Sequence, residues 1–255
     1  MVAEQPILRI PFMLNARIGS SIQAGLINSS YPRPSNSAII ICLLCERYKT
    51  ARLRALKETP QAFSSTYHRE AEYDDAIWVQ RLRNPLSKTF VALRTERRGG
   101  TETSDIELLA ANEWLGMIVI FGPRALPADG SGSKTPWKPF LSSVNLNEPP
   151  DPTAIVGYEA AYVAFSMFVL IDARRQGLGR SLVQASIETV RAEADSMHAT
   201  RANIGLFVEA KNQAAQRLYK GCGFIFLQGD SSLNGVEINQ VAMGKIVELP
   251  GGDSA

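Results

Sequence analysis

The second half of the chain carries the clearest pattern of hydrophobic and polar positions. Residues 160–170 are almost continuously apolar, as in a buried strand. A short polar loop follows, after which apolar residues return at helical spacing, at Leu178, Leu182, Val183, Ile187 and Val190. The pattern therefore predicts a strand, a loop and a long amphipathic helix that ends at Ala194.

Weaker patterns predict the remaining elements. The elements expected after this helix are a strand over 203–208, a helix over 210–222, and strands over 224–227 and 237–247. The elements expected before it are a weak strand over 7–13, helices from about 43 to 58 and from 74 or 75 to just before Pro85, and strands over 89–95, 106–111 and 114–121. This order predicts an α/β (α+β) fold, in which helices cover the faces of a mixed central sheet.

Proline, glycine and serine mark the expected domain boundaries. Residues 1–37 contain a run rich in Ser, Asn and Pro and are expected to be a poorly ordered extension. Residues 38–249 are expected to form a single domain, followed by a polar tail at 250–255. Within that domain, residues 123–153 are rich in Pro, Gly and Ser, which predicts a functional or disordered insertion.

The composition is that of an ordinary globular protein. Of the 255 residues, 45% are hydrophobic and 20% are charged, and the formal net charge is +2. This near-neutral balance lacks the basic field that favours nucleic acid or an acidic membrane. The longest apolar run, 38–45, is far shorter than the roughly 20 residues that span a bilayer, and no signal peptide is recognisable. We therefore expect no nucleic-acid or membrane partner, and a location in the cytoplasm or nucleus.

The loop before the long helix has the spacing Arg-x-x-Gly-x-Gly, at Arg174, Gly177 and Gly179. Glycines let the backbone approach a ligand closely, and a helix N-terminus offers free N–H groups to an anion. A Walker phosphate loop is excluded because no Gly-Lys-Ser/Thr occurs in the chain. A dinucleotide fingerprint is disfavoured because Leu182 stands where its third glycine belongs. The loop thus predicts an anion cradle.

A second motif lies about 30 residues downstream. Asn212 is followed by Tyr219 and by Gly223 and Phe224. Together with the glycine loop, this arrangement is similar to the GNAT superfamily of acyl-CoA-dependent N-acyltransferases, over about residues 158–226. The resemblance implies a mostly antiparallel central sheet, splayed at the acyl-CoA site. It implies transfer of an acetyl group from acetyl-CoA to a primary amine of a small molecule or a protein.

The resemblance also implies the residues that bind acetyl-CoA. Their backbone groups would bind the pantetheine arm at Met167, Phe168 and Val169, and the pyrophosphate at Arg174, Arg175, Gln176, Gly177, Leu178, Gly179 and Arg180. Asn212 would bind the pantetheine chain, cap the following helix, or do both. The chain departs from the family where Ile171 and Asp172 replace a common proline, although this change leaves the backbone donors in place. No cluster has metal-ligand spacing, so no metal is expected.

Tyr219 matches the tyrosine that acts in this family as general acid to the departing CoA thiolate, although it also fits a core position. The general base is open between Glu159, Glu113 and a chain of water molecules. A different reading is a non-catalytic GNAT-fold module that binds acyl-CoA or a partner protein. The expected partners of an enzyme are acetyl-CoA and an amine acceptor, and its expected state is a monomer or homodimer.

Overall fold

A mixed sheet of seven strands organises the described part of the chain. The computed structural model describes residues 7–9, 36–94, 104–141, 146–227 and 239–250. The strand order is β1-β2-β3-β4-β5-β7-β6. Only β4 and β5 run parallel among these described strands, and all other neighbours are antiparallel. The predicted fold class, a mixed and mostly antiparallel sheet flanked by helices, is confirmed.

The described elements follow the predicted order with some changes. The strands are β1 (Ile7–Arg9), β2 (Ser87–Arg94), β3 (Glu113–Leu126), β4 (Glu159–Val169), β5 (Arg201–Glu209), β6 (Ile225–Phe226) and β7 (Gln240–Val247). The α-helices are α1 (Asn36–Glu58), α2 (Tyr67–Ala71), α3 (Asp75–Arg83), α4 (Asp105–Ala111), α5 (Leu178–Ser196) and α6 (Gln213–Gly221). Short 3-10 turns are η2 (Pro60–Ala62), η3 (Ser131–Lys134), η4 (Lys138–Phe140) and η5 (Ile171–Ala173).

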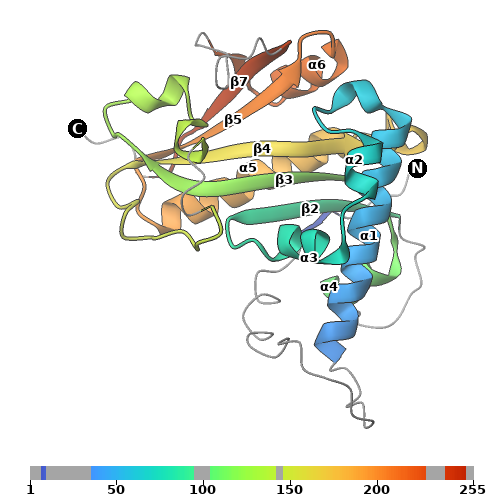
Figure 1. Cartoon of the computed structure of the whole chain (residues 1–255). Coiled ribbons are helices and arrows are strands. Elements are labelled where there is room, and N and C mark those ends of the chain that lie inside the picture. Colours follow the sequence, from blue (N-terminus) through green and yellow to red (C-terminus); the bar gives the residue numbers. More distant parts are fainter. Residues whose placement is uncertain (1–6, 10–35, 95–103, 142–145, 228–238, 251–255) are drawn as a thin grey trace.

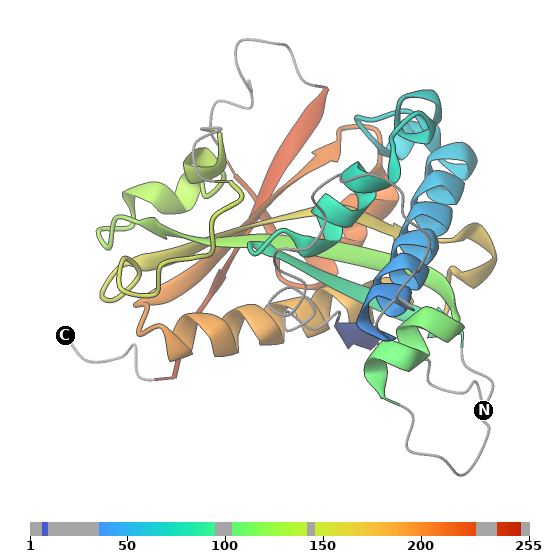
Figure 2. The same ribbon diagram turned by 60° about the horizontal axis from the view of Figure 1, so that its bottom comes forward.

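Helices cover both faces of the sheet. The long helix α5 runs along one face (Figure 2), whereas α1 and α3 lie on the other (Figure 1). Successive residues of β2 pack alternately into the cores on the two faces of the sheet, because neighbouring side chains of a strand point to opposite faces. Phe90 and Ala92 join the core under α5, and Val91 and Leu93 join the core under α1. Residues 90–93 of β2 are buried and are accordingly all apolar.

Helix α1 begins at Asn36, well before the predicted start near residue 43. The apolar run at 38–45 is therefore helical. Its periodicity is hidden because Ile39 and Leu43, on the outer side, are apolar as well and remain 45% and 46% exposed. Leu44 and Tyr48 lie on the buried stripe of the same helix.

The strand predicted at 106–111 is wrong, because these residues belong to helix α4. The Ser104 side chain accepts a hydrogen bond from the Glu107 N–H, and the Glu107 carboxylate accepts one from the Ser104 N–H. This reciprocal cap stabilises the first helical turn, and Leu109 and Ala110 bury the inner side of the helix. The spacing Ser-x-x-Glu before an apolar run was the available sequence signal.

Part of the predicted insertion at 123–153 is well packed. β3 continues to Leu126, so the strand enters the predicted insertion. The Trp137 ring lies 4.8 Å from the Phe207 ring, and the Phe140 ring lies 5.8 Å from the Phe121 ring. These contacts attach the segment to β3 and β5. Of the predicted N-terminal extension, Ile7–Arg9 pairs with β2 as β1, and residues 10–35 lie outside the described ranges.

Candidate active site

The candidate site lies where β4 and β5 part. The two strands pair in parallel only as far as Val163 and Gly205, although they continue to Val169 and Glu209. Just beyond the last pair, the register of β4 against β3 shifts and Ser166 takes a positive φ of 52°. An extra residue of this kind bends a strand and increases its twist. The sheet is therefore splayed as the resemblance implied, with unpaired backbone groups along the gap.

The glycine loop lies at the start of α5, at the open end of β4. Gly177 is the N-cap residue with a φ of 82° and gives no side-chain cap. A Cβ atom at Gly177 would meet no other atom within 4 Å, so its position faces open space. The N–H groups of the first turn of α5 have no carbonyl one turn earlier, and the helix dipole is positive here. The first turn of α5 therefore presents free N–H groups to this open space.

The parted strands and the glycine loop enclose a cavity of about 890 Å³, here called the loop cavity. Ten of the eleven residues predicted to bind acetyl-CoA line it: Met167, Phe168, Val169, Arg174, Arg175, Gly177, Leu178, Gly179, Arg180 and Asn212. The eleventh, Gln176, is exposed and does not line it. The Arg174 Nε donates to the Val169 carbonyl at 2.9 Å, which ties the loop back to the end of β4.

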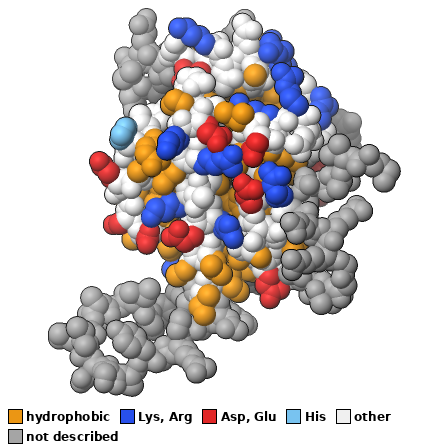
Figure 3. All heavy atoms as spheres, turned by 90° about the vertical axis from the view of Figure 1, so that its right-hand side faces the viewer, with side chains coloured by type: hydrophobic (Ala, Val, Ile, Leu, Met, Phe, Trp, Pro, Cys, Tyr) orange, Lys and Arg blue, Asp and Glu red, His pale blue; other side chains and the backbone are white. Residues whose placement is uncertain are grey.

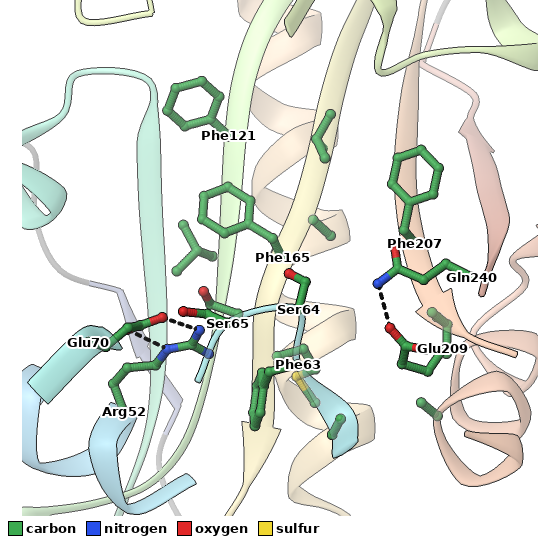
Figure 4. Close-up of a pocket in the computed structure, with 18 of the residues that line it drawn as sticks. Arg52, Phe63, Ser64, Ser65, Glu70, Phe121, Phe165, Phe207, Glu209 and Gln240 are labelled. Carbon is green, nitrogen blue, oxygen red and sulfur yellow. Dashed lines mark hydrogen bonds and ion pairs between the residues drawn. The ribbon is translucent and has the colours of Figure 1, made fainter. Parts of the chain in front are cut away.

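A second cavity of about 570 Å³ adjoins the first and is here called the aromatic cavity. Its aromatic lining residues are Tyr48, Phe63, Tyr73, Phe121, Phe165, Phe207 and Tyr219. Both cavities share the lining residues Ala62, Phe63, Met167, Glu209, Asn212, Ala215 and Leu218. Figure 4 shows the Arg52–Glu70 pair on one side of the aromatic cavity and the Glu209–Gln240 pair on the opposite side. A ligand in either cavity can therefore reach the other across these shared residues.

Tyr219 lines the aromatic cavity from α6 and is 6% exposed. Its ring lies 5.5 Å from the Phe224 ring in an edge-on contact. Burial, with a smaller contribution from Cys222, raises the pKa of the Tyr219 phenol well above its ordinary value. The phenol therefore keeps its proton throughout the neutral range, which is the form that a proton donor needs.

Asn212, the other motif residue, is the N-cap of α6. Its side-chain oxygen accepts a hydrogen bond from the Ala215 N–H at 3.1 Å. This is the capping role that the sequence left open beside cofactor binding. The same side chain lines both cavities, so the cap holds it at their junction.

Glu159, proposed from the sequence as a general base, lies at the start of β4, where β4 and β5 are still paired. Its carboxylate is 0% exposed and accepts hydrogen bonds from Arg201, from Asn203 Nδ2 at 2.7 Å and from Ser133 Oγ at 3.0 Å. It lines neither the loop cavity nor the aromatic cavity. These contacts attach η3 to the sheet, so the geometry does not support Glu159 as the base.

Glu113, the other carboxylate considered, also lies outside both cavities. It forms ion pairs with Arg54 at 3.0 Å and with Arg94 at 2.9 Å, while Asp172 pairs with Arg54 at 3.2 Å. Figure 3 shows basic and acidic side chains intermingled on that side of the molecule. Glu113 thus belongs to a network of surface ion pairs, which are individually weak.

Sequence reasoning missed Glu209 and the phenylalanines of the aromatic cavity. Glu209 ends β5, and Phe207 lies two residues earlier on the same face of that strand. This period of two was the available signal for the pair. Phe121 and Phe165 belong to β3 and β4, so only the folded sheet brings them to the same cavity.

Glu70 was missed as well, and its surroundings differ from those of Glu209. Burial by itself would raise the pKa of Glu70, but hydrogen bonds and positive charge from Arg52, with help from Ser65 and Arg81, outweigh it and lower that pKa to about 2. The Arg52 guanidinium donates to both Glu70 oxygens, at 2.8 and 3.1 Å, and Arg81 donates at 2.9 Å. Glu70 is therefore a permanent, neutralised anion at neutral pH.

Two absences hold for the described ranges alone. Within them, no group of three or more His, Cys, Asp or Glu side chains is arranged to hold a metal ion. In the same ranges, no helix combines the length and the apolar character needed to cross a membrane.

Comparison with known proteins finds one match to a family model. Residues 141–224 match the model of the acetyltransferase (GNAT) family, which spans the end of the predicted insertion, β4, the glycine loop and both motif residues of α6. No curated protein sequence matches the chain.

Solved acetyltransferases superpose on the chain at low identity. Arabidopsis thaliana NAA60 with a bisubstrate analogue is 15% identical with a TM-score of 0.46, over 78% of this chain and 95% of its own. A GNAT-family acetyltransferase of Staphylococcus aureus is 14% identical with a TM-score of 0.46, over 95% and 100%. The ribosomal-protein-S18-alanine N-acetyltransferase of Escherichia coli is 16% identical with a TM-score of 0.41, over 81% and 94%. The family match thus relates residues 141–224 of this chain to the GNAT acetyltransferases.

Proposed function

We propose that the protein is an N-acetyltransferase that takes the acetyl group of acetyl-CoA to a primary amine by direct attack. The observation that carries the proposal is the parting of β4 from β5 beside the α5 N-terminus, with two adjoining cavities in the gap. One cavity suits the donor and the other suits the acceptor. Tyr219 lies at the acceptor side, one turn along α6 from Ala215, which lines both cavities.

The loop cavity fits acetyl-CoA. Open space above Gly177 leaves room for the pyrophosphate against the first N–H groups of α5. The unpaired edge of β4 at Met167, Phe168 and Val169 offers backbone groups to the amides of the pantetheine arm. Arg175 and Arg180 line the same cavity and add positive charge. Gln176 does not line the cavity, so we leave its side chain out of this assignment.

The chain's own groups then serve the transfer. Acetyl-CoA would supply a thioester, whose C–S bond breaks as a bond forms between the amine nitrogen and the acetyl carbon. We assign to Tyr219 the donation of its phenol proton to the departing sulfur. Neither carboxylate considered from the sequence lines a cavity, so we assign both protons lost by the ammonium group to water. The Tyr219 phenolate regains its proton from water, which closes the cycle.

The proposal is tested by measuring donor binding and turnover separately. Calorimetry with acetyl-CoA should show one binding site per chain, and a panel of primary amines should release free CoA thiol. Absence of acetyl-CoA binding would overturn the proposal. Binding without thiol release for any amine would instead favour the non-catalytic acyl-CoA-binding module.

Gly177→Val should weaken acetyl-CoA binding about tenfold, because the valine side chain would enter the space above α5. The backbone φ of 82° at this position also strains any L side chain. Gly157→Val is the matched control. Gly157 has a φ of 74°, its Cβ would also meet nothing within 4 Å, and it lines neither cavity. Calorimetry should show weakened binding for Gly177→Val only, with similar losses of Tm in both. Equal affinities in the two variants would place the pyrophosphate elsewhere.

A further inference from the structure

The aromatic cavity presents phenyl rings to the space where an acceptor would lie. Phe165 is 43% exposed although it lies on β4 at the floor of a cavity. The Phe121 ring lies 6.0 Å from it, and Figure 4 shows both rings, and that of Phe207, above the polar pairs. Apolar surface that is exposed to water inside a cavity contributes to binding free energy when a ligand covers it. The aromatic cavity therefore favours a ligand that carries an apolar group.

Two of these rings, Phe121 and Phe207, pack against aromatic side chains from another segment. The Trp137 ring contacts Phe207 at 4.8 Å, and the Phe140 ring contacts Phe121 at 5.8 Å. Both supporting residues come from the segment between β3 and β4, and Trp137 is itself buried. Rings that are already packed in this way lose little conformational entropy when a ligand binds. The segment at 127–141 thus has a role in the site without lining it.

The charges of the aromatic cavity show where an ammonium group belongs. The Glu70 carboxylate is taken by Arg52 and Arg81. Glu209, by contrast, accepts a hydrogen bond from Gln240 at 2.7 Å and forms no ion pair with any described residue. It also lines both cavities, where donor and acceptor would meet. Glu209 is thus the carboxylate available to a cation.

The opposite side of the aromatic cavity disfavours a second cation. Arg52, Arg69 and Arg81 line it there, against the single carboxylate of Glu70. This arginine-rich side would repel the far end of a polyamine, because like charges close together raise the free energy of binding. A ligand with one ammonium group at Glu209 and an uncharged body avoids this repulsion.

We propose that the acceptor is a monocationic primary amine with an aromatic or similarly large apolar group near its amino group. Its ammonium group binds Glu209 until the proton is lost, and its apolar body covers Phe165 beside Phe121 and Phe207. This inference rests on the proposed acetyltransferase function and adds the class of its substrate. Glu209 is a binding residue in this assignment, and the phenylalanines determine specificity.

The first test compares three amine probes, 2-phenylethylamine, ethylamine and spermidine, by release of CoA thiol at saturating acetyl-CoA. We expect kcat/KM for 2-phenylethylamine to exceed that for ethylamine by at least about tenfold, from the burial of the phenyl group. A preference for ethylamine or spermidine, or no turnover of 2-phenylethylamine while acetyl-CoA binds, overturns this inference but leaves donor binding intact. Failure of acetyl-CoA to bind in calorimetry overturns the proposed function as well.

The second test assigns the preference to its residues. Phe165→Ala should lower the ratio of kcat/KM between 2-phenylethylamine and ethylamine about tenfold. Phe226→Ala is the matched control, because Phe226 is also 43% exposed and lines neither cavity, and it should leave the ratio unchanged. Both side chains are partly exposed, so the folds should persist, which Tm measurements check. An unchanged ratio in Phe165→Ala overturns the role of this ring.

The third test concerns the ammonium group. Glu209→Gln keeps the size of the side chain but removes its charge, and should raise KM for 2-phenylethylamine about tenfold, as expected for a lost charged hydrogen bond. Because Glu209 also lines the loop cavity, calorimetry with acetyl-CoA separates a loss of amine binding from a loss of donor binding. Glu248→Gln, an exposed carboxylate just after β7 and outside both cavities, should leave KM unchanged. An unaltered KM in Glu209→Gln would overturn the assignment of this carboxylate.

Discussion

Replacement of Tyr219 by phenylalanine is expected to lower kcat for amine acetylation about 100-fold, because it removes the proton offered to the departing thiolate. The ring is retained, so its contact with Phe224 at 5.5 Å and the buried end of α6 should persist. Thiol release at saturating acetyl-CoA and amine measures kcat, and calorimetry measures acetyl-CoA affinity. The affinity should change little, since Tyr219 does not line the loop cavity.

Tyr158→Phe is the control for this experiment, because Tyr158 is 51% exposed and lines neither cavity. An unchanged kcat in Tyr219→Phe would remove the general-acid role and return Tyr219 to the core position that the sequence also allowed. The pH dependence offers a second check. A general acid acts only while protonated, so its contribution is lost as pH rises through its pKa. Burial raises the pKa of Tyr219 above its ordinary value of 10.0. Tyr219 should therefore stay protonated, and cause no loss of the wild-type rate, at pH values below 10.

Glu70→Gln should lower the free energy of unfolding by about 3 kcal/mol at pH 7, because it leaves two arginines without their anion. The Glu70 side chain is 1% exposed and that of Arg52 is 7% exposed, so water replaces the lost charge poorly. Arg81, at 33% exposure, keeps some hydration and places the expected cost at the lower end of the range for buried pairs. Chemical denaturation at pH 7 measures the difference.

The pH dependence of this difference has a definite sign. The folded pKa of Glu70, about 2, lies below its ordinary value of 4.5, so the wild type gains stability from ionised Glu70 above about pH 4.5. That gain is lost as pH falls from about 4.5 to 2, and the two proteins should converge there. Glu72→Gln, exposed at the end of α2, should change stability by less than about 0.5 kcal/mol. Equal stability of wild type and Glu70→Gln at pH 7 would contradict the assignment.

Local sequence signals predicted the elements around the glycine loop well. The strand at 160–170, the glycine loop and the helix ending at Ala194 appear as β4, the loop before α5, and α5 itself. These elements are contiguous, and each is recognised by a period or by a residue with special backbone freedom, such as Gly177 at a φ of 82°. A contiguous motif needs no information about distant segments.

Elsewhere, the local patterns failed for identifiable reasons. In α1, apolar residues on both sides of the helix hid its period, and the start was predicted too late. In α4, a short apolar run was read as a strand although Ser104 and Glu107 formed a capping box before it. Short apolar runs are ambiguous between strand and helix unless the cap is weighed.

The aromatic cavity is lined by side chains from distant parts of the chain. Phe121, Phe165 and Phe207 come from three strands, and Arg52 and Glu70 from two helices, yet all line one cavity. No spacing in the sequence relates them. The same folding places Glu159, a plausible base by its position in the chain, in a buried ion pair with Arg201 at the closed end of β4.

The glycine loop and the Asn212 and Tyr219 motif could thus be read from the chain alone, because backbone conformation and helix starts are encoded in neighbouring residues. Together they indicate the donor that we propose, acetyl-CoA. The shape of the aromatic cavity, in which we propose that the acceptor binds, is a result of strand register, of the bend at Ser166 and of the packing of Trp137 and Phe140 against Phe207 and Phe121. Each of these arises from contacts between segments far apart in sequence, and therefore from the folded protein.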